Sequence, residues 1–139
     1  MERKVEIGIF LVRVVVGLIF FIHGFIKVQG GIEILAQWFE SIGIPGFLAY
    51  AVTAIELIGG MAMILGVGTR IISALFAIVM IVAIVTVKFE GGFTGTEAMT
   101  GYEFDLLLLA VSIQLGISGS KFLSLEALLK RSRETTINW

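Results

Sequence analysis

Long apolar runs separated by short polar segments dominate the pattern of hydrophobic and polar positions in this chain. Four runs stand out, at about residues 5–26, 47–65, 71–87 and 104–117. A helix needs about 20 mostly apolar residues to cross a bilayer, and about 17–25 is common. The last run is short unless its polar start lies within the membrane. We predict an all-α membrane protein, an antiparallel four-helix transmembrane bundle that forms one domain over residues 1–139.

The segment between the first two runs has a helical pattern of its own. Its apolar residues recur at helical spacing: Ile32, Leu35, Trp38, Phe39 and Ile42. Glu33, Gln37 and Glu40 occupy the opposite face, and glycines bracket the segment. An amphipathic helix anchored by a tryptophan is typical of the membrane interface. We therefore predict a short interfacial helix on the outer side of the bundle.

Composition agrees with lipid as the solvent. Hydrophobic residues make up 58% of the chain and charged residues 15%, with a mean hydropathy of +1.03. Ordinary soluble domains have about 45–50% apolar and about 25% charged residues. The net charge of −1 gives no indication of nucleic-acid binding. Without cysteine, the chain has no disulfide, thiolate metal site or CxxC relay.

The distribution of positive charge predicts the orientation of the bundle. Seven of the ten basic residues fall on one side of the predicted runs: Arg3, Lys4, Arg70, Lys121, Lys130, Arg131 and Arg133. Cytoplasmic loops of membrane proteins carry the excess of lysine and arginine. We expect a multi-pass membrane protein with both termini in the cytoplasm. The charged start resembles a signal peptide, but no small-x-small cleavage pattern follows, so we interpret the first run as a retained span.

Five polar side chains interrupt the apolar runs: Arg13, His23, Glu56, Asp105 and Gln114. A charge near the bilayer centre costs about 2.5–3.5 kcal/mol on insertion scales, so such a group usually faces other protein. Counting 1.5 Å per residue places Arg13 about 5–6 Å on the inner side of the middle and Glu56 almost at the middle. The reach of arginine then allows an Arg13–Glu56 pair.

A second polar layer is expected near the outer ends of the runs. His23 and Lys27 are four residues apart and share a helix face. Glu103 and Asp105, at the start of the last run, and Lys88, at the end of the third, belong to the same level. Simpler structural interpretations exist: the lysines anchor the interface, and the carboxylates suit a helix start. No HxxxH or ExxH spacing supports a metal site, and none is predicted.

Two ordered sets of motifs accompany the first and second runs. The first set reads LVR at 11–13, GLIF at 17–20, HG at 23–24 and Lys27; the second reads IELIGG at 55–60, LG at 65–66 and TR at 69–70. With Glu103 and Gly116, these motifs resemble the DoxX family of small bacterial membrane proteins over almost the whole chain. The chain departs from the family at GISG, 116–119, where a Gly-Pro-Gly-like turn is usual, and at SLE, 124–126, in place of SLD.

The resemblance implies a small membrane protein of oxidoreductase type that binds or acts on a quinone or catechol. It also implies a possible redox partner protein, but it identifies no electron carrier. The chain has no thiol, a single histidine and no dinucleotide fingerprint. The cofactor is therefore unknown, and a diffusible quinone is one candidate.

Residue roles follow from this hypothesis. His23 and Glu56 are the candidate catalytic residues, with His23 as a proton donor or acceptor because an imidazole titrates near about pH 6.5. Arg13, Lys27, Glu103 and Asp105 are the candidate ligand-binding residues. Two other classes stay open: a non-enzymatic scaffold or subunit that anchors a redox partner, and a small transporter. A polar path open to both faces would favour the transporter. A bundle filled with side chains would favour the scaffold.

Overall fold

The computed structural model describes residues 2–137, and its regular elements within these residues are helices. In chain order they are α1 (Arg3–Gly30), α2 (Ile32–Ser41), α3 (Phe47–Leu65), α4 (Thr69–Ala83), the π-helical turn η1 (Ile84–Lys88), the 3-10 turn η2 (Phe89–Gly91), α5 (Glu103–Ser118) and α6 (Leu125–Ile137). The all-α prediction is confirmed.

Three helical segments are long and apolar enough to cross a membrane. They are α1 with 28 residues, α3 with 19, and the continuous stretch Thr69–Gly91 with 23. The fourth candidate, α5, has only 16 residues. A helix of that length rises about 24 Å, which is less than the roughly 30 Å of a hydrocarbon core. A fourth crossing therefore stays a prediction.

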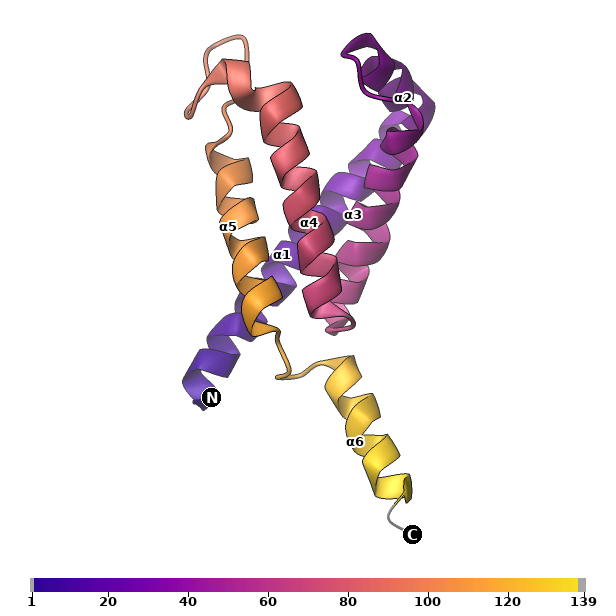
Figure 1. Cartoon of the computed structure of the whole chain (residues 1–139), viewed down its shortest axis with the longest axis vertical. Helices are drawn as coiled ribbons and strands as arrows, with labels where there is room; N and C mark the ends of the chain where they lie inside the picture. The colour runs from indigo at the N-terminus through magenta and orange to yellow at the C-terminus, as the bar shows by residue number, and fades with distance from the viewer. Residues whose placement is uncertain (1, 138–139) are drawn as a thin grey trace.

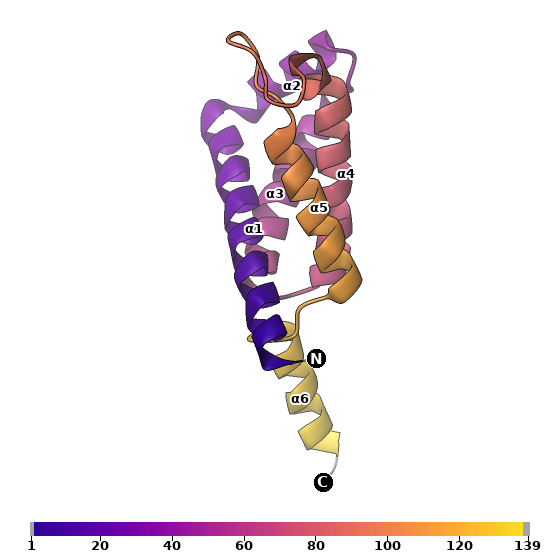
Figure 2. The ribbon, with the colours of Figure 1, turned by 90° about the vertical axis from the view of Figure 1, so that its left-hand side faces the viewer.

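The long helices lie side by side, with α1 packed most extensively on α3 and α4 on α5 (Figures 1 and 2). Contacts of α3 with α4 and of α1 with α5 join these two pairs. The short helix α2 covers one end of α1 and α3, which we call the α2 end. At the opposite end, the α6 end, α6 projects away from the other helices (Figure 1). The predicted helix in the first long loop is thus present as α2.

Glycines set the register between α1 and α3. A Cβ atom added to Gly60 would lie 2.6 Å from the backbone N of Phe21 and 2.7 Å from the carbonyl O of Gly17. A Cβ added to Gly24 would lie 2.8 Å from the backbone N of Leu57. Small residues let membrane helices approach this closely. The register that results brings Gly24 opposite the Glu56–Leu57 step of α3.

Two phenylalanine rings fill the centre of the helix packing. Phe20 of α1 and Phe76 of α4 stack with ring centroids 3.7 Å apart and an interplanar angle of 10°, and both are fully buried. Gly59 makes room for this stack, because a Cβ there would lie 2.9 Å from the Phe76 ring. The stack belongs to the hydrophobic core and gives the packing a dry middle.

Candidate functional site

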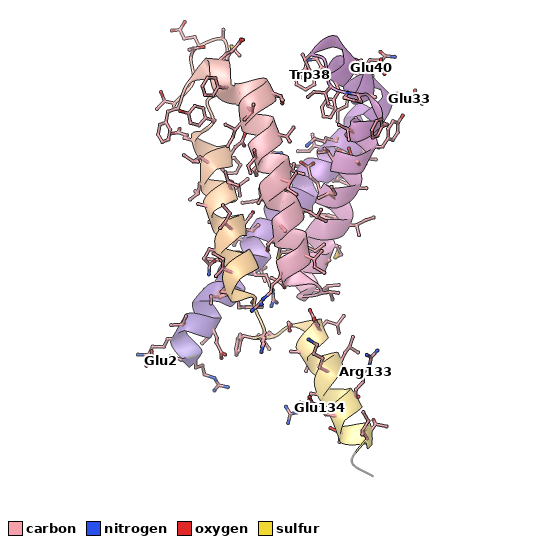
Figure 3. All side chains as sticks on the ribbon, viewed as in Figure 1. Glu2, Glu33, Trp38, Glu40, Arg133 and Glu134 are labelled. Carbon is pink, nitrogen blue, oxygen red and sulfur yellow. The ribbon has the colours of Figure 1, made fainter. Side chains whose placement is uncertain are left out.

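A cavity of about 350 Å³ lies between the helices toward the α2 end. Side chains of α1, α2, α3, α4 and α5 line it, and most of them are apolar or aromatic, including Phe20, Trp38 and Phe104. Pockets for small molecules typically enclose about 300–1,000 Å³ and combine apolar walls with a few polar groups. Figure 3 shows Trp38 on α2, which covers this end of the molecule. The cavity is therefore large enough for a small aromatic molecule.

Two lysine–carboxylate pairs line this cavity. Lys27 Nζ lies 2.6 Å from Glu56 Oε2, and Lys88 Nζ lies 2.8 Å from Asp105 Oδ2. In both pairs the carboxylate side chain is almost fully buried, with 4% of Glu56 and 6% of Asp105 exposed. The lysine side chains are more exposed, with 25% of Lys27 and 28% of Lys88 accessible to solvent. Each pair thus joins a buried anion to a cation that reaches the edge of the protein.

The predicted pair between Arg13 and Glu56 is wrong. Gly24 lies opposite Glu56, and Lys27 follows Gly24 on α1 by less than one helical turn. Lys27 is therefore the cation that reaches the Glu56 carboxylate. Arg13 precedes Gly24 by 11 residues, which corresponds to about 16 Å along the helix. The predicted pairing was based on depths counted from the ends of the apolar runs. The helix α1 extends beyond its run at both ends, from Arg3 to Gly30, so those depths were unreliable.

Arg13 instead lies fully buried at the α6 end and holds the linker between α5 and α6. Its Nη1 donates hydrogen bonds to Ser120 Oγ at 3.1 Å and to the carbonyl O of Phe122 at 3.0 Å. Its Nη2 donates to the carbonyl O of Leu123 at 2.9 Å. The C-termini of α3 and α5 also lie at this end, and helix C-termini favour a cation. Arg13 does not line the cavity.

The outer layer of polar residues is partly as predicted. His23 lines the same cavity as both ion pairs, and its ring centroid lies 6.5 Å from that of Phe104. Glu103 is exposed at the start of α5 and does not line the cavity. Glu103 and Asp105 are two residues apart and so point about 200° apart on a helix, which prevents both from facing inward.

Two further positions differ from the sequence interpretation. Gln114 is exposed, and its Nε2 donates to Ser118 Oγ of the same helix at 3.2 Å. Lys88, which the sequence analysis allowed as an interface anchor, is the partner of Asp105. The π-helical turn η1 ends at Lys88 and contributes to where its side chain points. Such turns inside helices are frequent at functional sites, and nothing in the apolar pattern indicated this one.

An all-helical chain with three membrane-length helices and an apolar cavity that holds two ion pairs defines a small helical membrane protein. The sequence model of the DoxX family matches residues 8–89, more than half of the chain. The chain belongs to the DoxX family. The matched residues include Lys27, Glu56 and Lys88, whereas Asp105 lies beyond them.

Three relatives show how far the similarity extends. The chain is 46% identical over 134 residues to "Putative oxidoreductase CatD" of Bacillus subtilis (strain 168), which covers 96% of each chain. It is 31% identical over 72 residues to "Inner membrane protein YqjF" of Escherichia coli (strain K12), 50% of this chain and 53% of the relative. It is 33% identical over 100 residues to an uncharacterized membrane protein of Mycobacterium tuberculosis, 68% of this chain and 61% of the relative. No solved structure matches.

Proposed function

We propose that this protein is a bacterial inner-membrane protein of oxidoreductase type that binds a quinone or catechol-like molecule in the cavity at the α2 end. The observation that carries this proposal is the cavity itself, where apolar walls meet Lys27, Glu56, Lys88, Asp105 and His23. The aromatic ring would lie against the apolar walls. Its oxygens would accept hydrogen bonds from the two ammonium groups.

The chemistry assigned to the site is proton exchange with the bound ring. Reduction of a quinone to a quinol consumes two electrons and two protons and converts two carbonyls into hydroxyls. His23 would supply or take up one proton, and the Lys27–Glu56 pair would exchange the other. The chain has no cysteine and one histidine, so we assign the electrons to a redox partner protein. The name of the Bacillus subtilis relative is consistent with this class of reaction.

The Phe20–Phe76 stack favours this function over transport. Phe20 lines the cavity on α1, and its ring is stacked on the fully buried Phe76. The stack belongs to the hydrophobic core beside the cavity and offers no polar group to a route toward the α6 end. The scaffold alternative is separated from the binding function by the experiment below.

The binding test compares two tryptophan substitutions one turn apart on α3. Both alanines are exposed, but Ala51 lines the cavity and Ala54 does not. Menadione and catechol should each raise the melting temperature of the detergent-solubilised protein, because a ligand that binds only the folded state stabilises it by mass action. Ala51→Trp should abolish this shift by filling the cavity, and Ala54→Trp should keep it. If neither compound shifts the melting of the unaltered protein between pH 5 and 8, the scaffold function is favoured instead.

A second test concerns residues at the site. His23→Ala should reduce the menadione shift and leave the melting of the unliganded protein almost unchanged, since His23 is exposed toward the cavity. Gln114→Ala removes an exposed polar side chain outside the cavity and serves as its control. Equal menadione shifts in both variants would remove His23 from the proposed site.

We also propose that α1, α3, α4 with η1, and α5 form an antiparallel four-helix transmembrane bundle, a single domain with the α6 end in the cytoplasm. The basic residues support this orientation, because Arg70 and the cations of α6 lie at that end. The chain has no cysteine, so single cysteines can be labelled without background. In intact cells, Ser41→Cys and Thr96→Cys should react with an impermeant thiol reagent, and Ser132→Cys should not. Labelling of Ser132→Cys alone would place the α6 end outside the cell and contradict the proposed orientation.

A further inference from the structure

A second hollow, of about 660 Å³, lies at the α6 end. Its walls are the turn between α3 and α4, the linker between α5 and α6, and the first turns of α6. It shares no lining residue with the cavity at the α2 end. Its lining is mainly polar and charged, whereas that of the other cavity is mainly apolar.

Positive charge dominates this hollow. Four basic side chains line it, namely Arg70, Lys121, Lys130 and Arg131, against the two carboxylates of Glu126 and Glu134. Glu126 is already engaged: its Oε2 accepts a hydrogen bond from Gly68 N at 3.1 Å, and its Oε1 lies 3.2 Å from Lys130 Nζ. These two donors hold the pKa of Glu126 below its ordinary value. Within residues 2–137, Arg70, Lys121 and Arg131 form no ion pair.

One residue that lines this hollow has a buried hydroxyl without a hydrogen-bond partner. Thr69, the first residue of α4, lines the hollow and is only 5% exposed. Its Oγ1 is buried and has no hydrogen-bond partner within the described residues. A buried hydroxyl without a partner destabilises the folded protein. A ligand that brings an acceptor oxygen to Thr69 would recover this cost.

The edges of the hollow are apolar. Ile71 lines it and is exposed, and Ile117 of α5 and Leu128 of α6 are exposed close in sequence to other lining residues. Exposed apolar side chains therefore lie in or next in sequence to the segments that line the hollow. Cations beside exposed isoleucine and leucine suit a molecule that carries both an anionic head and an acyl chain, more than a free anion.

We propose that the hollow at the α6 end binds the phosphate of an anionic phospholipid. Arg70 and Arg131 are the donors that can hold phosphate oxygens with a forked geometry, and the Thr69 hydroxyl donates a further hydrogen bond. The acyl chains extend along Ile71 and Ile117. The bound lipid then joins α6 to the turn between α3 and α4, which Glu126 already connects through Gly68.

The test measures binding of short-chain phosphatidylglycerol, phosphatidylcholine and inorganic phosphate to the detergent-solubilised protein by native mass spectrometry and thermal melting. Phosphatidylglycerol should bind, and phosphatidylcholine should bind much more weakly. Arg70→Gln and Arg131→Gln should each weaken phosphatidylglycerol binding by about 10-fold, the scale of one lost charged hydrogen bond. Arg133→Gln removes the same charge from α6 outside the hollow (Figure 3) and should leave binding unchanged.

Thr69→Val separates a specific site from general attraction of charge. It keeps the net charge and the shape of the side chain but removes the hydroxyl. Phosphatidylglycerol binding should fall, while the lipid-free protein should melt no lower than the unaltered one, because an unpaired buried group has been removed. An equal loss in Arg133→Gln and Arg131→Gln, or unchanged binding in Thr69→Val, would overturn the site. Equal stabilisation by inorganic phosphate would overturn the lipid assignment. Menadione binding at the α2 end should not change in these variants.

Discussion

The Lys27–Glu56 pair should be asymmetric when it is broken. In Lys27→Met the carboxylate of Glu56 stays in place, almost fully buried and without its ion-pair partner. In Glu56→Met the ammonium of Lys27 loses its partner, but this side chain lies near the end of α1 and is partly exposed. A flexible lysine can turn its head group toward the interface, whereas a buried carboxylate has no such route.

The magnitudes follow from this difference in burial. Leaving one charge of a buried pair uncompensated costs about 3–5 kcal/mol, and we assign that range to Lys27→Met. For Glu56→Met we expect about 1–2 kcal/mol, the scale of one charged hydrogen bond whose donor can find water. The double variant Lys27→Met/Glu56→Met should lie within about 1 kcal/mol of the unaltered protein, because apolar replacement of a whole buried pair is often neutral.

The assay is thermal melting of the detergent-solubilised protein, followed by tryptophan fluorescence, for the two single variants and the double variant. The expected order of melting temperatures is Lys27→Met lowest, then Glu56→Met, with the double variant highest of the three. Non-additivity in this cycle measures the coupling of the two side chains. If Glu56→Met melts below Lys27→Met, the burial argument fails. If the two losses add in the double variant, the two side chains do not interact.

Two further predictions concern the contacts that hold the helices. Gly60→Leu should destabilise the protein by more than about 2 kcal/mol, because the new side chain would collide with the backbone of α1. Gly8→Leu should be neutral, since no atom lies within 4 Å of a Cβ added there. Equal melting temperatures of the two variants would contradict the close contact of α1 and α3. Arg13→Gln should speed amide hydrogen exchange in the linker 120–124, because Arg13 holds the carbonyls of Phe122 and Leu123. Arg3→Gln, on the exposed start of α1, should not. Unchanged protection in Arg13→Gln would mean that the linker is fixed by other contacts.

The helices were largely predictable because they depend on local properties of the sequence. The run at 47–65 has the same bounds as α3, and the amphipathic segment after the first run is α2. The end of α1 was not predicted, since residues 27–30, which include Lys27, Gln29 and Gly30, continue the helix beyond the apolar run. Hydrophobicity ends where the solvent changes, whereas a helix ends where its backbone conformation changes, here at Gly31 with a φ of 91°.

Four of the six candidate site residues line one cavity, but their pairing did not follow from the sequence. Those four are His23, Lys27, Glu56 and Asp105, whereas Arg13 and Glu103 do not line it. The candidates were selected because polar groups in or beside apolar runs usually face other protein. The partner of Glu56 depends on the register between α1 and α3, which the contacts at Gly17, Gly24 and Gly60 determine. That information is distributed over two distant segments, so depth counting along each run could not supply it.

The π-helical turn η1 makes the winding of the third helical segment a determinant of side-chain direction. A π turn holds one residue more than the α-helical turn it replaces. If residues 84–88 were wound as an α-helix with none of them lost, Lys88 would rotate by about 100° about the helix axis. Helix packing around Phe76 would be untouched, yet Asp105 would lose its cation. Loss of one residue from 84–87 together with α-helical winding would instead return Lys88 to its present direction, so a homologue that lacks the extra residue should keep the lysine–aspartate pair.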